Sequence, residues 1–468
     1  MIKKLFSHSA IYGLAPQITS VASFLSLPLI TTHLTSIDFG VSGVLTAYTS
    51  AVSVFSTLGL RLVLVNSYFK MPSQYKWLWR QIYGFLSIWN LFYALLLSIL
   101  IYLVIPSEAI QNKWIIIFLN VLPLVFFSQT ITICSTYYQL KQEPLQVALR
   151  SGLFGLLTVA LNVYFIVYLK MGYMGWFWSN FISGILNNLS YFLPLNFILG
   201  FSPIFNFKWR LIKNSLKTSI PIIPHYYSSY LLNNSDKALM KVLSIDLVSI
   251  GRYNFAYMAG LFMNSIGMAS GMAVSPILNQ YYKNKDDESA KNLVFILQIS
   301  FLIFSFIISI WLKEIFQFSI SNQELANTYN LGIVIVMAYS YRPMYFGSVN
   351  KFFYMELTGL IWKITLTAGL LNVILNLLLI PFFGFEIAAL NTFIAYVYMG
   401  YAGFFSKQFK KINTAKYYPE FWIICKVFFL LLAYVIVELN YSIKIGISAF
   451  LVIIGYCAIK RIDILMKR

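Results

Sequence analysis

The sequence predicts an all-α integral membrane protein with about fourteen transmembrane helices. Hydrophobic residues make up 59% of the chain and charged residues only 10%, whereas soluble domains carry about 25% charged residues. Fourteen mostly apolar stretches approach the length of about 20 residues that crosses the hydrocarbon core of a bilayer. Lys and Arg residues alternate between the gaps that separate these stretches, as the loop charges of membrane proteins do.

The stretches fall into a group of six and a group of eight, divided by the cytoplasmic gap LGFSPIFNFKWRLIKNSLK. The first six run near residues 9–31, 40–62, 81–104, 114–137, 150–169 and 174–199. The other eight run near residues 216–238, 247–272, 292–312, 325–345, 361–381, 384–405, 420–438 and 442–459. An outer-membrane barrel is excluded because its strands would be about 10 residues long with alternating polarity. The first stretch has a basic head but is too long for a signal peptide, so we expect an uncleaved helix.

The charge pattern predicts the topology. Of the 34 Lys and Arg residues, 26 lie at the termini or in every second gap between the stretches. They include Arg61, Arg342 and Lys351, whereas Arg252 and Lys426 lie inside apolar stretches. Because cationic loops resist translocation, the cation-rich gaps and both termini should be cytoplasmic.

The order of the stretches suggests two lobes and an accessory pair. We expect an N-terminal lobe at 1–205 (helices 1–6), a C-terminal lobe at 206–410 (helices 7–12) and accessory helices 13–14 at 411–468. Ala15-Pro16-Gln17 in the first stretch corresponds to the proline-rich segment 220–224 in the seventh, which supports an internal duplication. Parallel lobes of this kind place a substrate site between them.

Several functional classes are disfavoured. No gap exceeds about 20 residues, which leaves no room for a soluble domain. No HExxH, GxSxG or nucleotide-binding loop occurs, so we expect a transporter without a cofactor rather than an enzyme. Cys134, Cys425 and Cys457 are scattered and indicate neither a disulfide framework nor a metal site. The net charge of +19 lies beside helix ends and indicates lipid headgroups, not nucleic acid.

Intramembrane ionisable residues are the functional candidates, because burying a charge at the bilayer centre costs about 2.5 to 3.5 kcal/mol. Arg61 should end the second span, Asp236 and Lys237 should close the seventh, and Arg252 should lie near the outer end of the eighth. Each is near enough to a helix end for the alternative that it only snorkels to the interface, which we also expect of Lys426.

His225 differs because it lies near the middle of the seventh helix, beside Pro221 and Pro224. An imidazole changes charge near neutral pH, which suits proton coupling or hydrogen bonding to a sugar or phosphate. The alternative is a neutral histidine hydrogen-bonded to a neighbouring helix. The two prolines should bend the helix where His225 enters it.

Three strings together resemble a known family. FLSLPLITTHLTSIDFGVSG is similar to the opening signature of bacterial polysaccharide flippases. SIPIIPHYYSSYLLNNSDKALMKVLSIDLVSIGRYNFAYMAG resembles their central signature, and LNVILNLLLIPFFGFEIAALNTFIAYV their paired-Asn, Ile-Pro and Thr pattern in helices 11 and 12. The family is the Wzx-type O-antigen and polysaccharide flippases of the multidrug/oligosaccharidyl-lipid/polysaccharide (MOP) exporter superfamily.

The resemblance implies two six-helix lobes in an inverted V around a cationic cavity. The implied cargo is an undecaprenyl-pyrophosphate-linked oligosaccharide, moved from the cytoplasmic to the periplasmic leaflet of the bacterial inner membrane. Arg61, His225, Asp236, Lys237 and Arg252 become cavity candidates, whereas helix 1 offers only Gln17 and His33. Coupling to a proton or sodium gradient is compatible with this role, as are a polysaccharide polymerase and a chain-length regulator as partners.

Two alternatives stay open at this stage. A cation-coupled multidrug antiporter of the same superfamily should carry deep acidic residues, and no Asp or Glu is expected at mid-span. An integral-membrane polymerase or ligase should carry a large extracytoplasmic loop, which no gap provides. The sequence does not reveal the sugars of the cargo, because ring recognition leaves no linear code.

Overall fold

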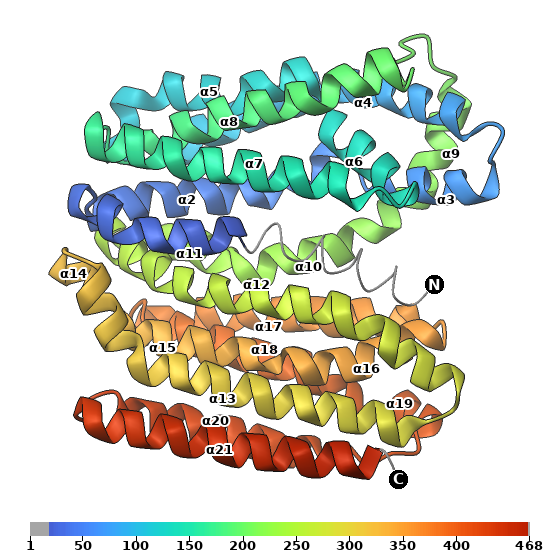
Figure 1. Ribbon diagram of the computed structural model, residues 1–468. Helices are drawn as coiled ribbons and strands as arrows, with labels where there is room; N and C mark the ends of the chain where they lie inside the picture. Colours follow the sequence, from blue (N-terminus) through green and yellow to red (C-terminus); the bar gives the residue numbers. More distant parts are fainter. Residues whose placement is uncertain (1–17, 467–468) are drawn as a thin grey trace. The chain divides into compact units, whose positions relative to one another are not determined.

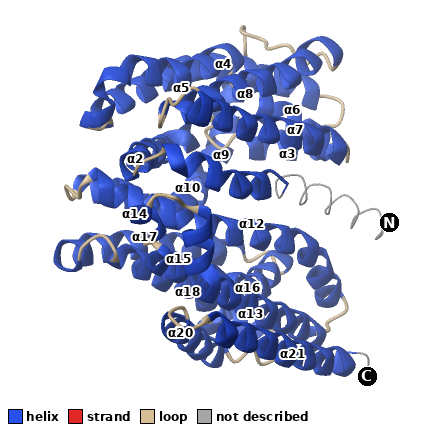
Figure 2. Ribbon diagram, turned by 60° about the vertical axis from the view of Figure 1, so that its left-hand side comes forward, coloured by secondary structure: helices blue, strands red, loops and turns tan. Residues whose placement is uncertain are grey.

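The computed structural model describes residues 18–466, and all regular structure in that range is helical (Figure 2). Eleven helices in this range are long and apolar enough to cross a membrane by length and composition. Three further segments complete the predicted fourteen: the shorter apolar helix Ile18–His33 and two segments, near 209–242 and 323–354, that are broken into shorter helices. The predicted all-α membrane class is therefore confirmed.

The structure divides into two compact units, one ending at Tyr230 and one beginning at Leu231. Each unit is described separately. The helices of the first unit are α2 (Ser36–Ser53), α3 (Arg61–Lys70), α4 (Tyr75–Val104), α5 (Lys113–Phe127), α6 (Thr130–Leu140), α7 (Pro144–Val163), α8 (Met174–Leu193) and α9 (Trp209–Ser219), and α10 (Ile223–Asn233) crosses the boundary. The helices α4, α5, α7 and α8 lie along one another in Figure 1.

Two spans of the first unit are interrupted. Between α2 and α3 the backbone takes positive φ at Leu58 and Gly59, and between α5 and α6 it does so at Ser128. The side chain of Asn90 on α4 is fully buried between the two breaks, where its Nδ2 lies 3.3 Å from both the carbonyl of Ser56 and the hydroxyl of Ser128. A buried backbone group must find an internal partner in a membrane. Asn90 therefore provides an internal partner for the Ser56 carbonyl at the first break and contacts the Ser128 side chain at the second.

The second unit contains the remaining helices, including the accessory pair. They are α11 (Ser235–Val242), α12 (Leu247–Lys283), α13 (Asp287–Ser319), α14 (Gln323–Ala326), α15 (Tyr329–Ala338), α16 (Arg342–Tyr354), α17 (Thr358–Phe383), α18 (Ile387–Phe405), α19 (Lys407–Ile412), α20 (Pro419–Ile436) and α21 (Tyr441–Met466). In Figure 1 the accessory helices α20 and α21 run along α13. The ion pairs Lys313–Glu438 and Lys444–Glu314 fasten them there.

The tenth segment breaks at Tyr339–Tyr341, a single 3-10 turn between α15 and α16. Pro343 has no N–H group to offer the carbonyl of Tyr339, and the N–H of Arg342 bonds that carbonyl instead of the carbonyl of Ala338. The 3-10 turn therefore leaves the Ala338 carbonyl without the i+4 donor that an α-helix would provide. The Nζ atom of Lys426 donates to it at 2.9 Å.

The structure corrects three positions expected from the sequence. Arg61 does not end the second span but begins α3, nine residues before that helical run ends at Lys70. Arg342 was expected in a cytoplasmic gap, but the tenth segment continues to Tyr354 and encloses it. Lys426 was expected to snorkel, but its side chain is fully buried. In all three cases local charge led to the wrong position, because the helices extend beyond the apolar windows or pack against other helices.

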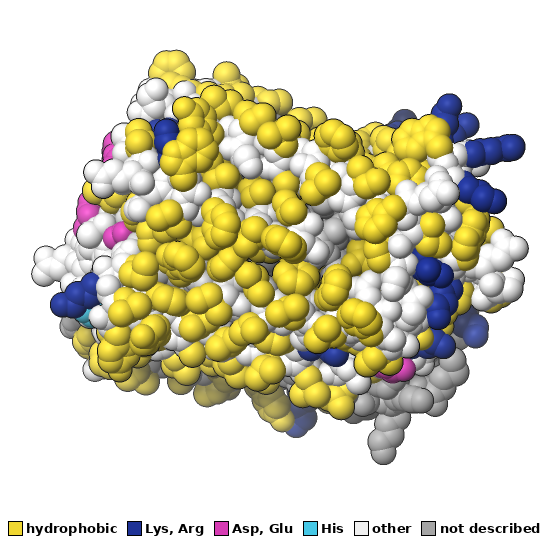
Figure 3. Space-filling model, turned by 90° about the horizontal axis from the view of Figure 1, so that it is seen from above, with side chains coloured by type: hydrophobic (Ala, Val, Ile, Leu, Met, Phe, Trp, Pro, Cys, Tyr) yellow, Lys and Arg dark blue, Asp and Glu magenta, His cyan; other side chains and the backbone are white. Residues whose placement is uncertain are grey.

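Figure 3 shows the distribution of charge on one face. An apolar band covers the middle of the face, Lys and Arg side chains gather at one end, and Asp and Glu side chains lie mainly at the other. This distribution is the one that a membrane-spanning bundle with one cationic rim requires.

Candidate functional site

A buried carboxylate is the centre of the polar interior of the second unit. Asp236 on α11 is fully buried. Its Oδ1 atom accepts hydrogen bonds from the amides of Asn372 (2.6 Å) and Asn376 (2.7 Å), and its Oδ2 atom accepts from the hydroxyls of Tyr253 (2.6 Å) and Thr392 (2.9 Å). We call these five residues the Asp236 cluster. Four donors from α12, α17 and α18 thus converge on a single acid.

The local sequence explains the convergence. Asn372 and Asn376 are four residues apart on α17, so their side chains lie one above the other on the same face. Asn391, one residue before Thr392 on α18, donates to Asn376 at 2.9 Å and holds the second amide in place. The oxygen Oδ1 of Asn391 is buried without a hydrogen-bond partner among the described residues. One acceptor oxygen beside the Asp236 cluster, Oδ1 of Asn391, is therefore free to accept a further hydrogen bond.

Lys237 lies next to Asp236 and is also buried, with 4% of its surface exposed. Its Nζ atom donates to Asn254 at 3.1 Å and lies 5.4 Å from the ring centre of Tyr257. Lys237 is therefore a neighbour of Asp236 in the chain but makes its own contacts with α12, outside the Asp236 cluster.

Three tyrosine hydroxyls converge on Asn233, the last residue of α10. Its Oδ1 atom accepts from Tyr396 at 2.6 Å, from Tyr339 at 3.3 Å and from Tyr257 at 3.4 Å. The ring of Tyr396 stacks on that of Tyr341, with centres 4.7 Å apart and planes 8° from parallel. We call Asn233, Tyr257, Tyr339, Tyr341 and Tyr396 the tyrosine cluster.

Arg342 extends the polar interior along α12. It begins α16, twelve residues before the helix ends at Tyr354, which is about 18 Å at 1.5 Å per residue. Its Nη2 atom donates to Asn264 on α12, and its Nε atom is buried without a partner. A Cβ at Gly267 would lie 2.8 Å from the Cδ atom of Arg342, so this glycine lets the side chain cross α12.

Arg342 and Lys426 both lie within cation–π distance of the Tyr341 ring. The guanidinium carbon of Arg342 is 5.6 Å from the ring centre of Tyr341, and Nζ of Lys426 is 5.9 Å from it. Neither cation forms an ion pair with any carboxylate of residues 18–466. A buried charge without a counter-ion is costly in a membrane. These two cations therefore provide a positive field that an anionic group could neutralise.

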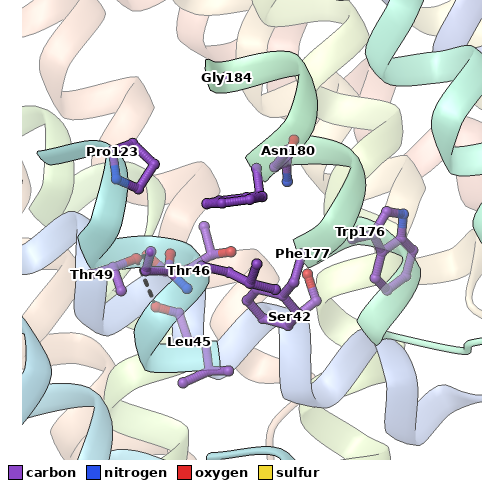
Figure 4. Close-up of a pocket in the computed structure, with 12 residues that line it drawn as sticks. Ser42, Leu45, Thr46, Thr49, Pro123, Trp176, Phe177, Asn180 and Gly184 are labelled. Carbon is purple, nitrogen blue, oxygen red and sulfur yellow. Dashed lines mark hydrogen bonds between the residues drawn. The ribbon is translucent and has the colours of Figure 1, made fainter. Parts of the chain in front are cut away.

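The first unit contains an uncharged pocket of about 260 Å³, shown in Figure 4. Ser42, Thr46 and Thr49 of α2 face Asn180 of α8 across it, and Trp176 and Phe177 form an aromatic wall. Thr46 and Asn180 are exposed to the pocket. Hydroxyls, an amide and aromatic faces together can bind a sugar ring through hydrogen bonds and stacking.

The other predicted residues lie apart. Arg61 donates from Nη2 to Gln139 at 2.8 Å in the first unit. His33 is exposed at the end of the first described helix, and Gln17 lies outside the described residues. His225 is half-buried on α10, at the middle of the segment 209–242, and its Nδ1 atom is buried without a partner.

Arg252 lines a larger pocket of about 690 Å³, where α12, α15, α18 and α20 meet within the second unit. Its Nε atom is buried without a hydrogen-bond partner. The sequence did not predict that an accessory helix would form one wall beside this residue.

Sequence reasoning missed Asn372, Asn376, Thr392 and Arg342. The two asparagines, spaced by four in an otherwise apolar helix, carry a signal that points to a shared polar partner. The signal for Arg342 was hidden, because the apolar window ends at about 345 although the helix does not.

Comparisons with known proteins agree with this geometry. Residues 6–282, more than half of the chain, match the family described as polysaccharide biosynthesis protein. A search of curated proteins found no match.

Solved structures match nearly the whole chain. The lipid II flippase MurJ, in an inward closed conformation, superposes with a TM-score of 0.74 at 15% identity, covering 97% of this chain and 99% of MurJ. A mutant of the MATE transporter VcmN of Vibrio cholerae gives 0.54 at 14% identity, over 87% and 97%. An outward-facing MATE transporter of the MOP superfamily gives 0.55 at 12% identity, over 88% and 96%. At these identities the likeness establishes the fold.

Proposed function

We propose that this chain, which belongs to the polysaccharide biosynthesis protein family, moves undecaprenyl-pyrophosphate-linked oligosaccharide repeat units across the bacterial inner membrane by alternating access. The resemblance that the sequence signatures indicated is confirmed at the level of the polysaccharide biosynthesis protein family, and the likeness to MurJ and to MATE transporters supports the proposal of a flippase of the MOP superfamily. The family match carries the proposal of a glycan cargo. An O-antigen or capsule-type repeat unit fits this role.

Arg342 is the group that we propose for the pyrophosphate. It combines an unpartnered buried Nε atom with a neighbouring buried cation, Lys426, on the same tyrosine ring. Arg binds phosphate oxygens with two parallel hydrogen bonds, which are stronger than neutral ones. Arg61 at the start of α3 is the cation of the first unit that we propose for the same path.

The uncharged pocket in the first unit supports a glycan over a cationic drug. Its lining contains hydroxyls, amides and aromatic rings but no Asp or Glu. A cationic drug would require an acid to replace its hydration, whereas a neutral sugar requires donors, acceptors and an apolar face. The pocket therefore favours the flippase over the multidrug antiporter.

Asp236 is the residue that we propose for coupling to a proton or sodium gradient. It is a buried carboxylate surrounded by neutral donors, and the side-chain oxygens of Asn372, Asn376 and Thr392 lie within its cluster. Oxygen ligands of this kind suit a hard cation, and a proton would neutralise the same carboxylate. His225, with its unpartnered Nδ1 atom, is a second proposed proton-exchanging group.

Reconstitution tests the proposal. The purified protein in liposomes should bring a synthetic undecaprenyl-pyrophosphate-linked oligosaccharide from the inner to the outer leaflet, where a lectin or glycosidase reaches the sugar. Undecaprenyl pyrophosphate without sugar is the matched control for cargo recognition. Liposomes that flip both lipids equally, or neither at any gradient, would contradict a flippase for glycan cargo. Protein that exports cationic dyes instead would support the antiporter.

The same proposal predicts a phenotype in cells. Loss of the protein should trap lipid-linked repeat units on the cytoplasmic leaflet and remove the surface polysaccharide. Surface polysaccharide that persists, in a strain without a second flippase, would contradict the assignment. A polymerase and a chain-length regulator are the proposed partners downstream.

A further inference from the structure

The pocket beside Arg252 is built entirely from the second unit. It encloses about 690 Å³ where α12, α15, α18 and the accessory helix α20 approach one another. The hydroxyl of Tyr434 on α20 donates to the carbonyl of Asn330 at 2.9 Å and ties the accessory helix to α15 at the pocket. A volume of this size holds a small ligand or the head and upper chain of a lipid.

Two opposite charges line the pocket without pairing. Arg252 is half-buried and its Nε atom has no hydrogen-bond partner, while the Phe385 ring lies 5.5 Å from its guanidinium carbon. Glu386 is exposed. Neither residue is in an ion pair with any other residue in the described range. The pocket thus presents one donor for an anion and one acceptor for a cation.

Only Glu386 lies at a helix end on the rim of the pocket. It is the N-cap of α18, whereas Arg252 and Val334 lie five residues into α12 and α15, and Leu430 lies six residues before the end of α20. At 1.5 Å per residue these three residues are about 8 to 9 Å from the near ends of their helices. Leu390 and Leu431 are 40% and 62% exposed, so the apolar part opens sideways to the surroundings of the helices.

We propose that this pocket binds a phospholipid whose headgroup carries both a phosphate and a primary ammonium. The phosphate would bond the guanidinium of Arg252, the ammonium would bond the carboxylate of Glu386, and the acyl chain would follow Val334, Leu390 and Leu430. A purely anionic lipid would leave Glu386 facing a phosphate, which is unfavourable. The cargo proposed above carries no ammonium on its pyrophosphate, so the same argument disfavours cargo at this site.

Native mass spectrometry on the full chain tests the proposal, with phosphatidylethanolamine, phosphatidylglycerol, phosphatidylcholine and undecaprenyl phosphate as probes. The wild type should retain one phosphatidylethanolamine with about tenfold preference over the other lipids, since each lost charge-assisted bond weakens binding by about that factor. Equal retention of phosphatidylethanolamine and phosphatidylglycerol would overturn the proposal. So would preferential retention of undecaprenyl phosphate, which would make the pocket a cargo site.

Variants separate the two charges. Glu386→Gln should abolish the preference for phosphatidylethanolamine while keeping phosphate binding, and Arg252→Gln should reduce retention of all phospholipids about tenfold. Leu390→Trp, at an exposed position, should reduce retention without touching either charge. Glu420→Gln at the opposite end of α20 is the matched control and should bind like the wild type. Unchanged binding in Glu386→Gln and Leu390→Trp would refute the site even if Arg252→Gln folded poorly.

Discussion

Replacing Asp236 by Asn and by Ala separates the charge of the carboxylate from its role as a hydrogen-bond acceptor. In Asp236→Asn, the new carbonyl can still accept from Asn372 and Asn376, and the new amide can donate to the hydroxyls of Tyr253 and Thr392, which rotate to accept. In Asp236→Ala, both amides lose their shorter hydrogen bond and keep only a second acceptor at 3.2 to 3.3 Å. Both variants remove the same negative charge, so a difference between their stabilities measures the hydrogen-bond acceptor alone.

The magnitudes follow from the four hydrogen bonds. A bond to a charged group contributes about 1.5 to 3 kcal/mol and a neutral bond about 0.5 to 1.5, so Asp236→Asn weakens four bonds by a total of about 4 to 6 kcal/mol. Removing the buried carboxylate recovers its desolvation penalty of several kcal/mol. We expect a net change within about 2 kcal/mol. Asp236→Ala recovers the same penalty but removes all four bonds, and Asn372 and Asn376 keep only their longer bonds to the carbonyl of Leu231 and to Oδ1 of Asn372, so we expect a net loss of about 2 to 6 kcal/mol.

The assay pairs thermal unfolding of purified protein with leaflet transport in liposomes under an imposed proton or sodium gradient. Asp236→Asn should unfold near the wild-type temperature yet lose the dependence of transport on the gradient, and Asp236→Ala should unfold at a clearly lower temperature. Asp246→Asn is the matched control, because Asp246 is an exposed N-cap of α12 and Asn caps a helix equally well. Gradient-driven transport that survives in Asp236→Asn would make this carboxylate structural only. An Asp236→Ala protein as stable as the wild type would refute the hydrogen-bond network itself.

Three further predictions follow from the positions of the cations. Arg342→Lys should keep part of the transport and Arg342→Gln should lose about tenfold or more, because a lysine keeps the charge but not the fork that binds phosphate; equal transport by both at equal expression would remove Arg342 from the cargo path. Lys426→Met should remove the charge-assisted bond from Lys426 to the Ala338 carbonyl, at a cost of about 1.5 to 3 kcal/mol offset by the removed buried charge, so its unfolding temperature should change little while transport falls, and unchanged transport would make Lys426 a structural lysine. Reporter fusions after residues 110, 242 and 440 should appear extracytoplasmic and those after 75, 210 and 412 cytoplasmic; one inverted fusion would contradict the predicted topology.

The sequence predicted the number and order of the helical segments because each apolar window must span a fixed thickness. It did not predict where those helices end. Arg342 and Lys351 were assigned to a loop, but α16 continues to Tyr354, and Lys351 pairs with Asp287 at 2.5 Å in a buried site. A hydropathy window ends at the first charge, whereas a helix ends where its backbone loses its partners. Buried ion pairs of this kind are invisible until the second helix is placed.

The candidate site was predicted in part. Residue type pointed to Asp236 and Lys237 near a helix end, and depth pointed to His225, but no partner could be predicted for any of them. The donors to Asp236 are more than 130 residues away on α17 and α18 for three of its four contacts. Such pairings depend on the packing of helices that are far apart in the chain. The only local sign of that packing in the sequence was the pair Asn372 and Asn376, four residues apart in an apolar helix.

The polar interior of the second unit provides a physical route by which the occupancy of Asp236 could influence Arg342. Asp236 lies three residues after Asn233, whose Oδ1 atom accepts from Tyr396, and the Tyr396 ring stacks on Tyr341 beside Arg342. Between Asn233 and Asp236 the helix is interrupted at Asn234, so α11 and α10 are separate elements that can reorient. Neutralising Asp236 would weaken the charge-assisted bonds that hold α11 against α17 and α18. Any resulting movement of α10 would shift Oδ1 of Asn233, which accepts from three tyrosine hydroxyls. The Tyr341 ring beside Arg342 and Lys426 would then shift as well, because Tyr396 stacks on it. A double-mutant cycle between Asp236→Asn and Tyr396→Phe should therefore give a coupling energy of about 0.5 to 3 kcal/mol. The measured quantity is the rate of leaflet transport of the pyrophosphate-linked oligosaccharide in liposomes. Strict additivity would mean that the carboxylate and the arginine act independently.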